Sequence, residues 1–158
     1  MSNPNKDVID VLNTLIEYSK DVEKGFKASV DDVQNPQLKA FFEQRAIDCA
    51  QAASELQAEV RHLGGDPETS TSFSGDLHRG WLNLKSMFTG KDEEAVLNTV
   101  EEGEDHALKA YKEAREKLVK LNNANAHNAL TLVDRQLQGV QRNHDQVKTL
   151  RNAARAKS

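Results

Sequence analysis

Residues on one side of the first part of the chain recur at alternating steps of four and three, the spacing of one face of an α-helix. This face consists of Val8, Leu12, Leu15, Ser19, Val22 and Phe26. The pattern predicts a first helix over about residues 4–31. A second helix is predicted over 36–63, because Asn35 followed by Pro36 suits a helix start and Gly64 with Gly65 suits a helix end.

Four further stretches show helical spacing. The second predicted helix carries Leu38, Phe42, Arg45, Cys49, Ala52, Leu56 and Leu63 on one face. A third is predicted over 92–121 and a fourth over 124–155, separated by a turn at Asn122 and Asn123. The connection over 64–91 is rich in Ser and Thr, but apolar residues from Leu77 to Phe88 return at helical spacing and predict a short helix over about 76–88.

The lengths of the connections predict the topology of this all-α chain. Short connections join the first helix to the second and the third to the fourth, so each pair forms an antiparallel hairpin. The connection over 64–91 is long enough to run along a bundle of about 40 Å, given a rise of about 1.5 Å per helical residue. We therefore predict one ferritin-like four-helix-bundle domain over residues 1–158, with a long crossover between the hairpins.

Composition and charge narrow the classes of partner. The 21 Lys and Arg residues are interspersed among 25 Asp and Glu residues, so no basic face for nucleic acid is expected. The sequence has no apolar run of about 20 residues and no apolar segment near its start, which predicts a cytoplasmic protein without a membrane span. Cys49 is the only cysteine and is expected to be a core residue.

Ionisable residues interrupt the apolar faces of the predicted helices. Glu104 lies between Val100 and Ala107 in the third helix, and His144 lies between Val140 and Val147 in the fourth. Burying an unpaired charge costs several kcal/mol. We therefore expect these side chains to have partners inside the bundle.

Counting from the turns places further polar residues at the same level. Glu101 and His144 are about equally far from the Asn122 turn, so they should face each other. Glu23 of the first helix lies opposite Arg45 of the second, and Asp48 follows Arg45 by about one turn. If the crossover returns the chain to the same end, these residues lie at one level near mid-bundle.

One interpretation of these predicted polar residues is a metal site. Carboxylates and histidines that project inward from four helices bind two iron or manganese ions in ferritin-like proteins. The predicted ligands are Glu23, Glu101, Glu104 and His144, with Asp48 as an additional or outer ligand, and the ion is iron, manganese or zinc. The set is incomplete, because the fourth helix offers Gln141 with His144 and the second places Arg45 beside the site.

The other interpretation is a satisfied polar network that fixes the register of the helices. In it, Arg45 pairs with Glu23 or Glu104, and His144 hydrogen-bonds Glu101. A third hypothesis is self-association or binding of a partner helix, since the long helices carry apolar residues beyond the core face. These residues are Ile9, Val11, Ile16 and Phe41.

Several short stretches resemble a bacterial family of ferritin-like four-helix-bundle proteins that is catalogued as a domain of unknown function. They include Leu63-Gly64-Gly65, His78-Arg79-Gly80-Trp81, Gly103-Glu104-Asp105 and His144-Asp145, in that order along the chain. The resemblance implies a ferritin-like bundle and brings no established activity. Since the metal set is incomplete, we expect a non-enzymatic bundle, with metal binding and partner binding as alternatives.

Overall fold

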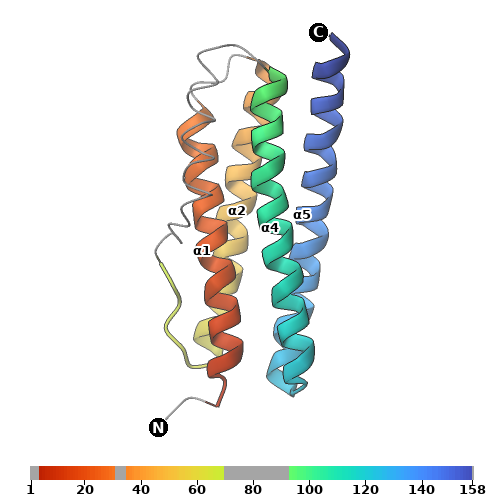
Figure 1. Ribbon diagram of the computed structural model, residues 1–158. Helices are drawn as coiled ribbons and strands as arrows, with labels where there is room; N and C mark the ends of the chain where they lie inside the picture. The colour runs from red at the N-terminus through yellow and green to blue at the C-terminus, as the bar shows by residue number, and fades with distance from the viewer. Residues whose placement is uncertain (1–3, 31–34, 70–92, 158) are drawn as a thin grey trace.

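The computed structural model describes residues 4–30, 35–69 and 93–157. In this part of the chain it contains four long helices (Figure 1), namely α1 over Lys6–Ser29, α2 over Pro36–His62, α4 over Glu93–Leu121 and α5 over Ala124–Lys157. The short helix predicted over about 76–88 lies outside the described residues. The all-α architecture agrees with the prediction.

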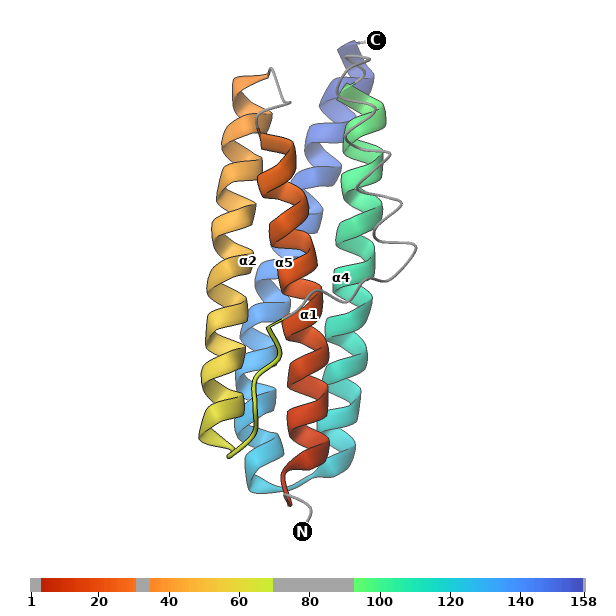
Figure 2. The ribbon, with the colours of Figure 1, turned by 90° about the vertical axis from the view of Figure 1, so that its left-hand side faces the viewer.

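The helices run in the directions that the connection lengths predict. In Figure 1, α1 rises from the N-terminal end, α2 and α4 descend, and α5 rises to the C-terminus. The hairpins α1–α2 and α4–α5 are thus antiparallel, and α2 is parallel to α4. Figures 1 and 2 together place α1 diagonally across from α5, with α2 and α4 on the other diagonal. A contact between α2 and α4 therefore crosses the centre of the bundle.

Local sequence sets both ends of α2. The side-chain oxygen of Asn35 accepts the backbone N–H groups of the second and third residues after it at 2.9 and 3.4 Å, and Pro36 opens the helix. At the other end, Gly64 adopts a φ of 82°, which glycine tolerates without steric cost. The N–H groups of Gly64 and of the following residue bond the carbonyls of Arg61 and Val60, which closes the helix in a Schellman motif.

The core consists of two apolar clusters stacked along the bundle. One is centred on Leu12, Leu56, Leu118 and Val133, and the other on Phe26, Phe42, Leu97 and Val147. Buried polar side chains lie at mid-bundle, where α1, α4 and α5 pass from one cluster to the other. We call them the polar layer; its members are Ser19, Arg45, Glu104, Tyr111 and Gln136.

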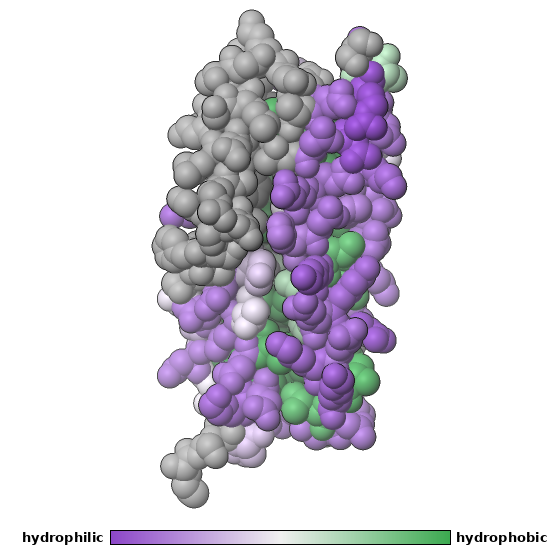
Figure 3. Space-filling model, viewed as in Figure 1, coloured by the Kyte–Doolittle hydropathy of each residue, from purple (hydrophilic) through white to green (hydrophobic). Residues whose placement is uncertain are grey.

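The surface offers little support for a second large apolar interface. In the view of Figure 3, hydrophilic residues cover most of the described surface. Three of the extra apolar residues, Ile9, Ile16 and Phe41, are buried and widen the core. Among the described residues, the exposed large hydrophobic side chains are Ile47 and Val119. Self-association thus remains a prediction without a specific surface.

None of the described helices is both long enough and apolar enough to cross a bilayer.

Candidate functional site

The centre of the polar layer is an ion pair between α2 and α4. Arg45 Nε donates to Glu104 Oε1 at 2.9 Å, and Arg45 Nη2 donates to Glu104 Oε2 at 3.1 Å. The side chains are 5 % and 1 % exposed. Two parallel hydrogen bonds of this kind are the strongest form of the arginine–carboxylate interaction. Both oxygens of Glu104 are therefore occupied by the guanidinium group.

Other groups around Arg45 also suit a positive charge. Its guanidinium carbon lies 5.7 Å from the centroid of the Phe26 ring, a cation–π distance. Arg45 Nη1 is 3.8 Å from Asp48 Oδ2. Burial lowers the pKa of Arg45, but the Glu104 carboxylate raises it, and the net result lies above the ordinary value. Arg45 therefore keeps its positive charge and links α2 to α4 across the centre of the bundle.

The rest of the layer is a chain of neutral hydrogen-bonding groups. The Tyr111 hydroxyl donates to Gln136 Oε1 at 2.8 Å, and the Ser19 hydroxyl lies 3.5 Å from the Tyr111 oxygen. Gln136 Nε2 donates to the Ala52 carbonyl at 3.3 Å and to Glu55 Oε1 at 3.4 Å. These contacts connect all four helices at mid-bundle.

The Cys49 thiol and the Tyr111 hydroxyl, which are titratable groups at this level, are uncharged at neutral pH. Burial raises the pKa of the Cys49 thiol to about 12. Burial likewise raises the pKa of Tyr111 to about 12. Neither group therefore supplies a thiolate nucleophile or a general base near pH 7.

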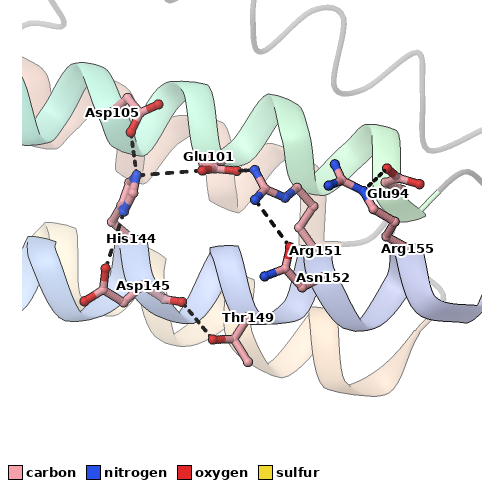
Figure 4. A network of polar contacts seen from close by, with 9 residues as sticks. All are labelled: Glu94, Glu101, Asp105, His144, Asp145, Thr149, Arg151, Asn152 and Arg155. Atoms are coloured by element: carbon pink, nitrogen blue, oxygen red, sulfur yellow. Dashed lines mark hydrogen bonds and ion pairs between the residues drawn. The ribbon is translucent and has the colours of Figure 1, made fainter.

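A second polar cluster lies between α4 and α5, nearer the surface (Figure 4). His144 Nε2 is 2.5 Å from Asp105 Oδ1 and 4.0 Å from Glu101 Oε1. The other oxygen of Glu101 accepts a hydrogen bond from Arg151. The side chains of Glu101 and His144 are each 15 % exposed, whereas Asp105 is 59 % exposed. We call Glu101, Asp105 and His144 the α4–α5 cluster.

The positions of these residues explain why they meet. Glu101 and Asp105 are four residues apart, which places both carboxylates on one side of α4. His144 lies across the antiparallel hairpin from Glu101, as counting from the turn predicts. One ligand atom from each of the three residues lies within 4.8 Å of the others, and among the described residues this is the group of metal-ligating side chains that the structure brings together.

The five predicted ligands occupy different settings. Glu101 and His144 meet in the α4–α5 cluster, but the hydrogen bond of His144 goes to Asp105 instead of Glu101. Glu104 binds Arg45, one of the two partners expected for that arginine. Two predicted ligands have local partners: Glu23 pairs with Lys27 at 2.7 Å, and Asp48 accepts from Gln44 at 2.9 Å.

Asp105 was not among the predicted ligands. The prediction rested on polar residues that interrupt the apolar helix faces, and Asp105 is exposed. The feature of the sequence that could have identified Asp105 as a ligand is its position four residues after Glu101, opposite His144.

The polar layer does not suit a di-iron or di-manganese centre. Such a centre requires several inward-facing carboxylates and histidines to balance the charge of two ions. Among the buried side chains that the structure describes, Glu104 is the carboxylate at this level, and Arg45 neutralises it. The neighbouring groups Ser19, Tyr111 and Gln136 are neutral. Two metal ions placed here would be repelled by the Arg45 guanidinium. Their own positive charge would not be balanced, because Glu104 is already paired with Arg45.

Comparison with solved structures identifies the fold. The chain is similar to a protein from Bacillus anthracis str. Ames described as ferritin like, diiron-carboxylate, with a TM-score of 0.71 and 18 % sequence identity. The similarity covers 95 % of this chain and 99 % of that chain. At this identity the match shows the fold, which is the ferritin-like four-helix bundle predicted from the sequence.

Comparison of the sequence with known proteins gives a family and no function. No curated protein matches the chain. The family described as "Domain of unknown function (DUF2383)" matches residues 7–117, which is most of the chain. The chain therefore belongs to the DUF2383 family.

Proposed function

We propose that this protein is a non-enzymatic ferritin-like bundle that binds one divalent transition-metal ion through Glu101, Asp105 and His144. The observation that supports this most is the convergence of two carboxylate oxygens and one imidazole nitrogen within 4.8 Å. One imidazole with two carboxylates suits iron, manganese or zinc. The site lies on the α4–α5 face and is distinct from the mid-bundle position of a di-metal centre.

The geometry of His144 favours coordination through Nε2. This atom faces Asp105 and Glu101, at 2.5 and 4.0 Å from their nearest oxygens. The other ring nitrogen, Nδ1, is buried without a hydrogen bond in the described part of the chain and lies 3.6 Å from Asp145 Oδ1. An ion on Nε2 would leave the ring proton on Nδ1. Asp145 would then help orient the imidazole, the common outer contact of metal-bound histidines.

The charge of the cluster also favours a cation. Glu101 and Asp105 contribute two negative charges, and Arg151, which bonds Glu101, contributes one positive charge. The net charge is therefore negative when the imidazole is neutral. Arg151 holds Glu101 through one oxygen only, which leaves the oxygen that faces His144 for an ion.

The polar layer supports the non-enzymatic part of the proposal. Its buried carboxylate is held by Arg45 in two hydrogen bonds. The buried Cys49 and Tyr111 are both protonated at neutral pH, because burial raises each pKa to about 12. A reaction that depends on a buried base or nucleophile at mid-bundle therefore has no suitable group among these residues.

Titration of the purified chain with Zn²⁺ and Mn²⁺ after chelator treatment tests the metal site. We expect calorimetry to show one ion per chain. His144→Ala should bind the ion at least tenfold more weakly, because loss of a hydrogen-bond partner of a metal ligand alone costs about 10- to 100-fold in affinity. The matched control is His106→Ala, an exposed histidine on α4 outside the cluster. Equal binding by the parent chain and both variants, or no binding by any of them, would refute the site.

A further inference from the structure

We propose that a cavity between α2 and α5 binds a small, uncharged aromatic molecule that carries a hydroxyl group. The cavity has a volume of about 380 Å³ and is lined by side chains from all four helices. Ligand pockets in proteins have volumes of about 300–1,000 Å³ and often lie between the helices of bundles. We call this space the α2–α5 cavity.

The cavity reaches the centre of the bundle. Most of its lining residues belong to α2 and α5, among them Ala52 and Gly139. Its lining also includes Ser19 of α1 and Tyr111 of α4, which belong to the polar layer. A molecule that enters between α2 and α5 thus meets buried hydrogen-bonding groups at the inner end.

Small residues leave this space open. Gly139 lacks a side chain, and a Cβ placed there would have its nearest contact at 3.7 Å, with the flexible end of Arg142. Glycine inside a helix costs about 0.5–1 kcal/mol relative to alanine. Since the φ of Gly139 is not positive, its backbone does not require glycine, and its lack of a side chain leaves more space in the cavity.

The inner wall has unused hydrogen-bonding capacity. Ser19 is 6 % exposed, and its one contact in the described part of the chain, with the Tyr111 oxygen, is 3.5 Å long. Ordinary O–H···O hydrogen bonds are about 2.7 Å long, so this contact is weak. Tyr111 donates its proton to Gln136 and keeps its oxygen available as an acceptor. A ligand hydroxyl would satisfy both groups by accepting from Ser19 and donating to Tyr111.

The surroundings of these hydroxyl groups define the class of ligand. Val22, Ala107 and Val140 are apolar wall residues, which suits a ring. Three arginines line the cavity: Glu104 pairs with Arg45, Glu55 pairs with Arg135, and Arg142 is exposed at the surface. An anionic group pushed to the inner end would lose its hydration without gaining a free counter-charge. A phenol-like molecule therefore fits better than a benzoate-like one.

Phenol and benzoate serve as matched probes with the full-length chain. We expect phenol to bind saturably in calorimetry and to shift the amide NMR signals of Ser19, Tyr111 and Gly139, whereas benzoate at the same concentrations does neither. Ser19→Ala should weaken phenol binding about two- to tenfold, the effect of one hydrogen bond. Added chelator should not change phenol binding, which separates this site from the α4–α5 cluster.

Gly139→Leu tests whether the cavity is the site, because Gly139 lines the cavity and a leucine side chain there would take up part of its space. The control is Gly103→Leu on α4, where a Cβ meets nothing within 4 Å and which does not line the cavity. We expect at least a tenfold loss of phenol affinity in Gly139→Leu and none in Gly103→Leu. Absence of saturable phenol binding by the parent chain would overturn the proposal. So would unchanged binding by Gly139→Leu, benzoate binding as tight as phenol, or shifts confined to other residues in the parent spectrum.

Discussion

Arg45→Met is expected to lower the free energy of unfolding by about 3–5 kcal/mol, the usual effect of removing one partner from a buried ion pair. The reason is the Glu104 carboxylate, whose side chain is 1 % exposed and which receives both hydrogen bonds from Arg45. Methionine retains the apolar length of the side chain but leaves that carboxylate buried without a partner. Urea denaturation followed by circular dichroism measures the change.

The double variant Arg45→Met/Glu104→Met separates the charge from the packing. Replacing both members of a buried pair by apolar residues of similar size is often neutral or stabilising. We therefore expect it to recover most of the stability that the single variant loses. The control is Arg115→Met, which breaks a surface pair with Asp134 at 2.8 Å and should cost less than about 1 kcal/mol. An Arg45→Met variant no less stable than this control would contradict the ion-pair account.

Phe42→Ala is expected to cost about 3–5 kcal/mol, the range for a buried phenylalanine reduced to alanine. Phe42 is fully buried, and its ring centroid lies 5.1 Å from that of Phe26 and 6.1 Å from that of Phe41. The substitution removes one ring from this group of three at the Arg45 side of the bundle. Its measurement is the same urea denaturation, with Val119→Ala, at a 47 % exposed position, as the control. Similar costs for the two variants would show that the three rings do not carry core packing.

The fold could be predicted because several local signals agreed. The Asn35-Pro36 start and the Gly64-Gly65 end of α2 have specific backbone requirements, and the structure shows both motifs formed. The length of the connection after α2 predicted that α2 and α4 run parallel, and the helix directions show this arrangement. The apolar faces of the four helices then pack against one another in two clusters along the bundle.

The ion pair could be predicted only in part. Helical spacing places Arg45 and Glu104 on buried faces at a similar level. It equally permits a pair between Arg45 and Glu23, because helix rotation and side-chain direction decide which carboxylate the guanidinium reaches. The diagonal contact from α2 to α4 follows from the packing of all four helices, which no single helix pattern contains.

The two proposed sites were harder to see in the sequence. Asp105 belongs to the α4–α5 cluster but is exposed, so it does not interrupt an apolar face. The α2–α5 cavity depends on how small residues on different helices face each other. The sequence places Gly139 in the interior of the last helix. Its contribution to the cavity becomes clear only from the positions of Ala52 and Tyr111, which line the same space from other helices.

X-ray diffraction with anomalous scattering, on crystals grown with Mn²⁺ or Zn²⁺, tests the central claim most directly. That claim is that an arginine–carboxylate pair occupies the mid-bundle position and that metal binds on the α4–α5 face. We predict one anomalous peak beside His144 Nε2, with the Arg45 guanidinium in contact with both oxygens of Glu104. Two peaks at mid-bundle with Glu104 as a ligand, and Arg45 displaced from it, would contradict the account.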